Sequence, residues 1–392
     1  MLEALCAFDG SARARSRLVQ AADAYQAQVI ASRGRADRNQ LLRAESDVKA
    51  APRECFIEDA RGQLTLRAAG QQYHAGCFEV LRLHALKARA LQAQARNSQQ
   101  PARLRLFVCD GTGPGTDIGA LQAFAPPRTL FQVASQFNCL EAPGAFITEV
   151  SDYLHDPTQG PRASVSAFPG TLLRHYAAPA DAASAPRFVQ ISDGPQINLL
   201  SAVCGPGLAN VRNGYLRASD VHDAAAFARV LDDRFDALAV GVHEDVQVVL
   251  GADWDGAVEA SPHRRIAQVF TSTVAAGMYG DVHGSDADIL HILWSLQRAA
   301  YLGTLLAAAA NGKELVVLTL IGGGVFGNPI PLIWRAIEWS LGQVAHFLHR
   351  DLTVLVNGRN LGEHVDSSTL SEAAMARAGL LLRLDKAGLT LA

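Results

Sequence analysis

The sequence predicts an α/β protein of three layers, in which helices cover both faces of a mixed, largely parallel sheet. Two observations lead to this prediction. In the last third of the chain, strand-like and helix-like segments alternate, and that order requires right-handed crossovers between parallel strands. The strand-like segments there are continuous apolar runs such as "ELVVLTLI", which is typical of strands buried on both faces.

The alternating part begins with a predicted strand over residues 265–275 and a long, mostly buried helix over 286–312. Gly312 is placed where a helix usually ends. A strand over 314–321, a helix over 330–348 and a strand over 352–358 follow. After residue 360, a short helix over 371–379 and a strand over 380–384 are predicted.

The first part of the chain has a different pattern of residues. Residues 10–53 have helical periodicity and are more basic than the chain as a whole. We expect a solvated helical extension there, with a partner-binding or targeting helix pair as the alternative. Strands are predicted over 63–68 and 103–109, on either side of a helix over 77–95. Further strand-like runs are found at 129–137, 163–168, 188–192 and 237–243.

These segments predict three parts of the chain. Residues 1–55 form the helical N-terminal extension, residues 56–360 the main domain, and residues 361–392 a tail that packs on that domain. With 392 residues, of which 49% are hydrophobic, the chain can bury one large core.

Composition excludes several classes of protein. A net charge of −3 and a pI near 6.5 argue against a general nucleic-acid binder. No apolar run reaches the roughly 18 residues of a membrane span, and Glu3 and Asp9 interrupt the pattern of a signal peptide. The six cysteines include no C-x-x-C pair, so we expect a reduced compartment, no structural zinc and no other metal. The expected location is the cytoplasm, or a host cell reached by a non-classical secretion route.

The stretch "LTLIGGGVFGNPI", residues 318–330, passes from an apolar strand through three glycines into a helix start. Glycines let backbone N–H groups converge on anionic oxygens, and the following helix adds its positive end. Val325 and Phe326 are placed at the loop tip, where a phenyl face can pack on a ribose. The pattern therefore predicts a phosphate-binding loop.

Two other interpretations of this loop remain open. Gly322, Gly324 and Gly327 also satisfy the G-x-G-x-x-G pattern of a dinucleotide-binding oxidoreductase. Its late position, and the absence of an acidic residue after the next strand, argue against that class. The loop could also be a strand-to-helix turn without a ligand.

Polar residues follow two other predicted elements. Gln136 and Asn138 stand at the carboxyl end of the strand over 129–137, and Asp110 ends the strand before it. A tight polar turn holds Asp156, Thr158, Gln159 and Gly160. The carboxyl ends of parallel strands are where α/β proteins bind ligands, so we expect these residues to share one site.

Five segments of the sequence, taken in order, resemble a divergent branch of the macrodomains, the ADP-ribose-binding fold: "VASQFN", "D-x-TQGP", "GTLLRHY", "QIN" and "LTLIGGGVFGNP". The resemblance covers roughly residues 60–358. This branch contains stand-alone proteins with a long N-terminal elaboration. One bacterial effector subgroup within it removes ADP-ribose from arginine, including arginine of ubiquitin.

The resemblance implies roles for single residues. Asp110 would accept the adenine amino group, Asn138 would contact the distal ribose, and Asn357 would contact the adenosine. The glycine loop would wrap the diphosphate, with Phe326 beside the distal ribose. The ligand-binding residues predicted in this way are Asp110, Gln136, Asn138, Thr158, Gln159, Gly160, Gly322, Gly323, Gly324, Val325, Phe326, Gly327, Asn328 and Asn357. One departure is that "CLEAPG" follows Asn138 where the family has a glycine triplet.

The predicted catalytic residues are Asp281, Asp286 and Asp288, in the stretch "MYGDVHGSDADILHIL". One carboxylate would polarise a water toward C1″ of the ribose, and another would pair with a substrate guanidinium. Carboxylates also stabilise the cationic sugar of the transition state. The structural alternative is helix capping. Glu141 and Asp156 are the other acidic candidates.

Together, these observations predict a hydrolase that removes mono-ADP-ribose from modified protein side chains, arginine foremost. The expected partners are ADP-ribose and an ADP-ribosylated protein, with ubiquitin as one candidate, and no nucleic acid, membrane or cofactor. We expect a monomer. The alternatives are a reader module that binds ADP-ribose without turnover and a Rossmann-type NAD-dependent oxidoreductase.

Overall fold

The computed structural model describes residues 1–97, 102–112, 114–180, 186–251, 258, 260–261, 263–276 and 287–392. Its centre is an eleven-stranded sheet with the order β1-β2-β3-β6-β7-β5-β8-β9-β4-β10-β11. The strands are β1 (Phe56–Glu58), β2 (Leu64–Ala68), β3 (Gln71–Arg82), β4 (Leu104–Gly111), β5 (Thr129–Ala134), β6 (Ala239–Gln247), β7 (Arg265–Thr271), β8 (Leu315–Leu318), β9 (Leu352–Gly358), β10 (Leu381–Asp385) and β11 (Gly388–Leu391).

The sheet is mixed, as predicted, and its parallel part is its middle. β7, β5, β8, β9, β4 and β10 are adjacent and parallel. The strands on either side of this block pair antiparallel. A parallel block needs long crossovers, and the chain supplies them as helices.

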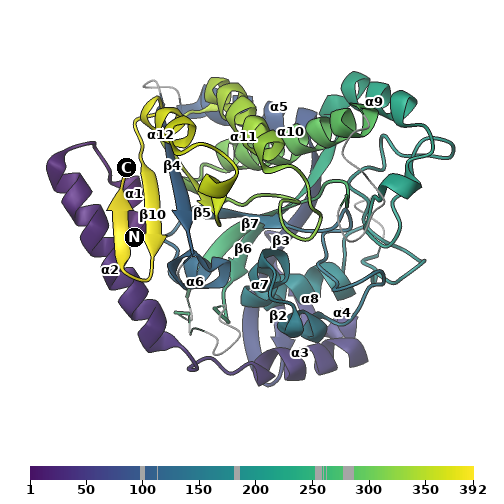
Figure 1. Ribbon diagram of the computed structural model, residues 1–392. Coiled ribbons are helices and arrows are strands. Elements are labelled where there is room, and N and C mark those ends of the chain that lie inside the picture. The colour runs from purple at the N-terminus through teal and green to yellow at the C-terminus, as the bar shows by residue number, and fades with distance from the viewer. Residues whose placement is uncertain are drawn as a thin grey trace.

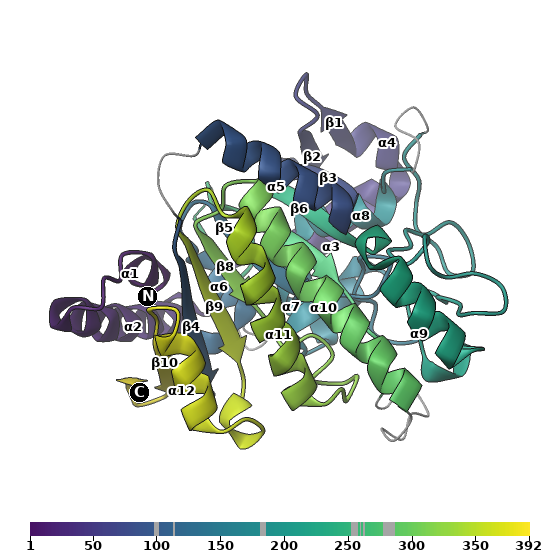
Figure 2. The same ribbon diagram turned by 90° about the horizontal axis from the view of Figure 1, so that it is seen from above.

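The helices are α1 (Leu2–Cys6), α2 (Ala12–Ser32), α3 (Asn39–Ala50), α4 (Pro52–Cys55), α5 (Leu83–Asn97), α6 (Ile118–Ala123), α7 (Gln159–Ser166), α8 (Phe168–Tyr176), α9 (Ala224–Asp233), α10 (Ala287–Ala310), α11 (Ile330–Val344) and α12 (Ser367–Met375). Figures 1 and 2 show α5, α10, α11 and α12 together over one face of the sheet, with α6, α7 and α8 on the other.

Alternating side chains of the central strands bind the two helical layers to the sheet. Leu106 and Val108 of β4 belong to the apolar cluster under α5, α10 and α11. Phe107 and Cys109, between and beyond them, belong to the cluster on the opposite face. Since successive residues of a strand point to opposite faces, this alternation confirms the predicted three-layer α/β arrangement.

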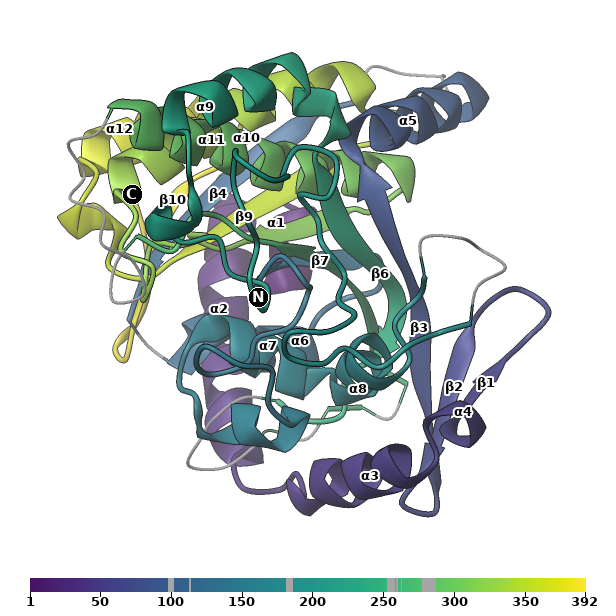
Figure 3. The same cartoon turned by 90° about the vertical axis from the view of Figure 1, so that its right-hand side faces the viewer.

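The first 55 residues are helical, as predicted, and both of their long helices pack on the sheet region. α2 lies against β11, and both chain termini are on this side of the molecule (Figure 1). Phe8, just after α1, makes an edge-to-face contact with Phe107 of β4, with 5.4 Å between ring centroids. α3 lies at the other side of the molecule, against β2 and α8 (Figure 3).

Three predicted elements differ from the structure. Residues 77–82 end β3 rather than begin a helix, because they pair with residues 239–244 of β6, and this pairing overrides their helical propensity. Residues 163–168 form the end of α7, the cap residue Ala167 and the first residue of α8, because Thr158 starts a helix with Pro161 in its first turn. Residues 188–192 contribute only an isolated bridge between Phe188 and Ala178.

Within the described part of the chain, no helix is long and apolar enough to cross a membrane. All six cysteines are free thiols.

The close approach of Gly379 to β4 predicts a large effect of a single methyl group. A Cβ at Gly379 would lie 1.7 Å from the carbonyl oxygen of Leu106. We expect Gly379→Ala to lower the free energy of unfolding by about 2 kcal/mol or more, because the backbone of β4 must shift. Urea denaturation measures this loss.

Gly342 provides the matched control. It lies in α11, and a Cβ there would meet no atom within 4 Å. Gly342→Ala should raise stability by about 0.5–1 kcal/mol, the usual gain of alanine over glycine in a helix. Equal effects of the two substitutions would contradict the packing described here.

Candidate functional site

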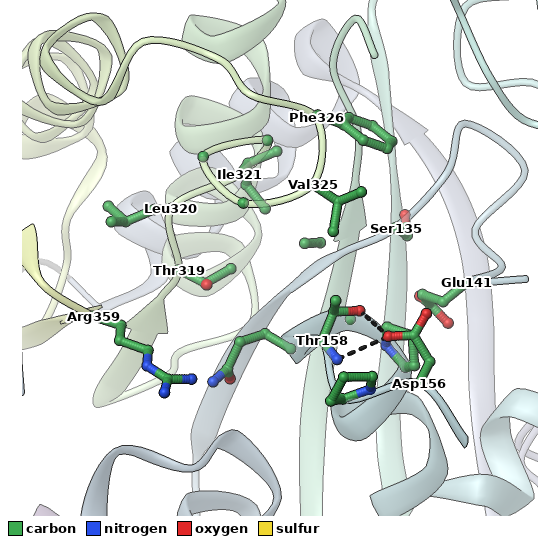
Figure 4. Close-up of a pocket in the computed structure, with 18 of the residues that line it drawn as sticks. Ser135, Glu141, Asp156, Thr158, Thr319, Leu320, Ile321, Val325, Phe326 and Arg359 are labelled. Carbon is green, nitrogen blue, oxygen red and sulfur yellow. Dashed lines mark hydrogen bonds between the residues drawn. The ribbon is translucent and has the colours of Figure 1, made fainter. Parts of the chain in front are cut away.

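A cavity of about 450 Å³ opens at the carboxyl ends of β5, β8 and β9. This is the edge at which α/β sheets bind ligands, and the volume suits a ligand of nucleotide size. The residues of its wall, drawn in part in Figure 4, are Thr116, Ala134–Gln136, Glu141–Pro143, Asp156–Pro161, Tyr215, Thr319–Phe326, Ile330, Asn357, Arg359, Asn360, Glu363 and His364.

The glycine loop forms one wall of the cavity. The amide of Asn328 donates to the carbonyl of Gly322, and the amide of Gly327 to that of Gly324, both at 2.9 Å. Gly322 has a φ of +76°, and a Cβ there would lie 2.2 Å from Nδ2 of Asn328, so only glycine fits. Within the described part of the chain, the amides of Gly324 and Val325 have no hydrogen-bond partner. They remain available to an anion.

A second helix start forms the facing wall. Oδ1 of Asp156 accepts hydrogen bonds from the amide of Thr158 at 2.8 Å and from its hydroxyl at 2.6 Å (Figure 4). This turn opens α7, and the first residues of α7 line the cavity. A Cβ at Gly160 would lie 2.0 Å from the carbonyl oxygen of Ala134, so glycine lets α7 pass the end of β5. The N-termini of α7 and α11 both lie at the cavity, and both favour negative charge.

Glu141 is a buried carboxyl in the cavity wall, with 4% of its surface exposed. Its Oε2 accepts a hydrogen bond from the hydroxyl of Ser164. Its Oε1 has no hydrogen-bond partner among the described residues. Burial raises the pKa of Glu141 to about 8, although the charge of Arg174 and the Ser164 hydroxyl favour the ionised form. Glu141 is therefore mainly protonated at neutral pH and can donate a proton.

Arg174 stands behind Ser164 and is fully buried. Its guanidinium donates to the carbonyl of Cys139 at 3.0 Å and to the hydroxyls of Thr171 at 3.2 Å and Ser164 at 3.4 Å. It also lies 3.6 Å from the ring centroid of Phe270. These contacts satisfy a buried cation that would otherwise be costly, and they place a positive charge behind Glu141.

His243 completes this network. Its Nε2 lies 2.7 Å from the carbonyl oxygen of Ala75 and therefore carries the proton. Its Nδ1, 3.1 Å from Nη1 of Arg174, is then the acceptor. Burial, and next the charge of Arg174, lower the pKa of His243 well below its usual value, which keeps the ring neutral.

Next to Glu141, the cavity wall is partly aromatic. Tyr215 and Phe326 have ring centroids 6.0 Å apart. Nε2 of Gln136 donates to the Tyr215 hydroxyl at 2.7 Å and to the carbonyl of Ala142 at 2.8 Å. Oε1 of Gln136 is buried and has no partner in the described ranges. This part of the wall thus combines apolar faces with acceptor oxygens.

The other end of the cavity is polar. Nδ2 of Asn357, at the end of β9, donates to the carbonyl of Thr116 at 2.9 Å. Arg359 is exposed at the rim and makes no ion pair with any described residue. Figure 4 shows Arg359 and Glu141 at opposite ends of the cavity, with the glycine loop above the space between them.

The structure brings most of the predicted ligand-binding residues together. Those that line the cavity are Gln136, Thr158, Gln159, Gly160, Gly322, Gly323, Gly324, Val325, Phe326 and Asn357. Asp110, Asn138, Gly327 and Asn328 do not line it. Asn138 is fully buried, donating to Oε1 of Gln196 and accepting from the amide of Leu140, both at 3.1 Å. Asp110 packs against the turn at Gly362.

The predicted catalytic aspartates are placed differently. Asp281 and Asp286 lie outside the described residues. Asp288 is exposed in the first turn of α10 and is not among the residues of the cavity wall. The catalytic role of these three residues stays a prediction. The carboxyls of the other two acidic candidates, Glu141 and Asp156, belong to the cavity wall.

Sequence reasoning missed several residues of the site. No sequence pattern marks Tyr215 or Arg359. The cavity is not lined by Ser164, Arg174 or His243, which lie behind its wall in the protein interior. A signal existed for one of them, because an arginine within an otherwise apolar helical stretch, "GTLLRHY", needs buried partners.

Among solved structures, the chain is similar to poly(ADP-ribose) glycohydrolase from Thermomonospora curvata, with 14% identity and a TM-score of 0.42 over 87% of this chain and 100% of that chain. The same enzyme bound to the inhibitor ADP-HPD gives 15% identity and a TM-score of 0.40 over the same shares. The apo poly(ADP-ribose) glycohydrolase from Deinococcus radiodurans gives 12% identity and a TM-score of 0.39, over 76% of this chain and 93% of that chain. No protein-family model matches the chain, and no curated protein matches it in sequence.

The protonation of Glu141 predicts how stability depends on pH. The pKa of Glu141 is about 8 in the folded protein and 4.5 in the unfolded chain. Between these values the folded state binds the extra proton, so this group's contribution to stability is present at low pH and is lost as pH rises. In that window we expect Glu141 to lower the free energy of unfolding by about 1.4 kcal/mol per pH unit.

Glu141→Gln should remove this slope, because glutamine does not titrate. The difference between variant and wild type, measured by urea denaturation at several pH values, should grow in favour of the variant as pH rises from 5 to about 8. A difference that does not change with pH would mean that Glu141 keeps an ordinary pKa.

Proposed function

We propose that this protein is a hydrolase that cleaves the glycosidic bond between ADP-ribose and a modified group. One observation carries the proposal: a buried carboxyl, Glu141, is held in its protonated form at one end of a cavity whose middle is built for anions. A carboxylic acid with a raised pKa is the proton donor that glycoside hydrolysis needs. The resemblance of the "TQGP" and "GGGVFGN" segments to macrodomains supports ADP-ribose as the ligand.

In this proposal, the parts of ADP-ribose would lie along the cavity in order. The diphosphate would accept hydrogen bonds from the amides of Gly324 and Val325, between the N-termini of α7 and α11. The adenosine would occupy the end at Asn357 and Arg359. The distal ribose would then lie by Phe326 and Tyr215, with its C1″ toward Glu141.

In the proposed reaction, Glu141 donates its proton to the leaving atom while the bond from that atom to C1″ breaks. The positive charge that develops on the ribose would be stabilised by the carboxylate of Asp156, which Figure 4 shows on the same side of the cavity as Glu141. A water molecule then adds to C1″ and returns one proton to Glu141, which restores the acid. While Glu141 is ionised, the Ser164 hydroxyl and the Arg174 guanidinium behind it stabilise its charge.

Which linkage is cleaved depends on how much the leaving atom needs a proton. The sequence predicts arginine as the modified residue, with a carboxylate of Asp281, Asp286 or Asp288 beside its guanidinium. A proton donor such as Glu141 is most useful where the leaving atom is an oxygen, because an alkoxide leaves poorly without a proton. We therefore propose an oxygen-linked ADP-ribose as the second candidate substrate. Ubiquitin remains one candidate for the modified protein.

The oxidoreductase alternative does not fit the topology. Numbered by their order in the chain, the six parallel strands stand in the order 3-2-4-5-1-6, whereas dinucleotide-binding folds have the order 3-2-1-4-5-6. The alternative of a reader module keeps the same cavity without turnover. Release of ADP-ribose that depends on Glu141 would distinguish a hydrolase from a reader.

The proposed diphosphate-binding loop can be tested by substitution. Gly324→Glu places a negative charge where the diphosphate would bind, and a Cβ there meets no atom within 4 Å, so the fold should tolerate it. We expect ADP-ribose binding to weaken at least about 100-fold. Gly324→Gln, of the same size and without charge, should bind more tightly than the glutamate variant. Equal affinity of both variants by calorimetry would contradict a diphosphate at this loop.

The proposed role of Glu141 in catalysis can be tested separately. Glu141→Gln should lower kcat at least about 100-fold, the usual contribution of a general acid, and leave ADP-ribose binding nearly unchanged. In the wild type, kcat/KM should fall as pH rises through about 8, because Glu141 then loses its proton. Release of ADP-ribose from substrates of defined linkage measures both effects.

Controls for this assay separate the candidate carboxyls. Asp281→Asn, Asp286→Asn and Asp288→Asn should slow release from arginine if these residues bind the guanidinium, and should leave oxygen-linked substrates unaffected. If the wild type binds ADP-ribose but releases none from any substrate, the protein is a reader.

A further inference from the structure

A buried carboxylate connects the N-terminal helix α3 to the turn beside the cavity. Glu45 of α3 is 2% exposed. Its Oε1 accepts hydrogen bonds from the amide of Val150 at 2.5 Å and from the hydroxyl of Tyr176 at 2.8 Å. Its Oε2 accepts from the amide of Ser151 at 2.8 Å. All three partners are donors, so the site requires an acceptor at both oxygens.

The two amides belong to the start of a short 3-10 helix, η2 (Val150–His155). The first amides of a helix have no partner within it and point outward, so a carboxylate placed there fixes that end. Glu45 does this from another element of the fold, 105 residues away in sequence. The position of η2 therefore depends on α3.

η2 leads directly into the candidate site. Asp156 is its C-cap residue, lines the cavity, and opens the turn to Thr158 from which α7 starts. Tyr153 of η2 is fully buried, and burial and the nearby charge of Glu141 raise its pKa well above the usual value. A displacement of η2 would thus move Asp156 and disturb the surroundings of Glu141.

The remainder of α3 supports the same contact. Leu41, Ala44 and Val48 are fully buried in an apolar cluster that also contains Val150 and Tyr153. Lys49 of α3 pairs with Glu149, the residue before η2. Figure 3 shows α3 lying along the base of the molecule, near α8, which carries Tyr176.

We propose that Glu45 is a positioning residue of the site: its carboxylate holds residues 150–158 so that Asp156 and the start of α7 face the cavity. Glu45 is not among the residues that line the cavity. The N-terminal helical segment then contributes to the geometry of the site. The inference rests on the proposed function only in naming ADP-ribose as the ligand whose binding reports on it.

Glu45→Gln tests the proposal with little change of volume. One terminal atom of glutamine is an N–H donor, and it would face the amide of Val150 or Ser151, which are donors too. We expect ADP-ribose to bind about tenfold more weakly in calorimetry. We also expect faster hydrogen exchange in residues 150–158. In the assay, KM should rise more than kcat falls.

Two variants in the same helix serve as controls. Asp47→Asn makes the same kind of change at a carboxylate that accepts from the amide of Ala69, at 2.7 Å, in the turn between β2 and β3. Val48→Ala removes buried volume from the same apolar cluster and lowers stability, but it leaves the carboxylate of Glu45 and its three hydrogen-bond partners unchanged. Both variants should bind ADP-ribose as the wild type does, and Val48→Ala should do so even if its melting temperature falls as far as that of Glu45→Gln.

Wild-type affinity and wild-type exchange in Glu45→Gln would overturn the proposal. An equal loss of affinity in Val48→Ala at matched stability would also overturn it, since the effect would then be one of stability alone. If the wild-type protein binds no ADP-ribose, the proposed function fails. The exchange of residues 150–158 in Glu45→Gln then decides separately whether Glu45 holds this segment.

Discussion

The buried guanidinium of Arg174 is the contact on which the rest of the site depends. It joins the carbonyl of Cys139 after β5, the ring of His243 in β6, and the hydroxyls of Ser164 in α7 and Thr171 in α8. A cation without water requires such a set of partners, so the four segments are held in one arrangement. Glu141 reaches this cation only through Ser164, and its own burial outweighs the attraction. The result is a neutral acid in a cavity wall.

The part of the cavity that we propose binds the diphosphate has a different origin, in backbone geometry rather than charge. The glycine loop after β8 and the start of α7 both line the cavity, and the amides of Gly324 and Val325 have no hydrogen-bond partner among the described residues. Gly322 and Gly160 are required there because a Cβ would collide with Asn328 or with the backbone of β5. Two helix N-termini, rather than a cluster of lysines, then provide the positive potential. A site of this kind is compatible with a chain of net charge −3.

The sequence was sufficient to predict the parts that depend on local pattern. Apolar runs predicted β9 over its observed length and β8 with four residues too many, and the glycines predicted the loop between β8 and α11, because period and glycine placement are local properties. The protonation state of Glu141 was beyond local reasoning, because burial in the folded protein raises its pKa against the opposing effects of Arg174 and Ser164. The same holds for Glu45, whose partners stand more than a hundred residues away. Residues 77–82 show the opposite case, in which strand pairing overrides a helical pattern.

The most direct test of the central claim is a crystal structure of the protein with ADP-ribose. We expect the diphosphate at the amides of Gly324 and Val325 and the adenosine toward Asn357. The hydroxyl on C1″ of the distal ribose should then lie within hydrogen-bonding distance of the Glu141 carboxyl, directly or through one water. A ligand bound in the reverse direction, with adenine beside Glu141, or bound outside this cavity, would contradict it.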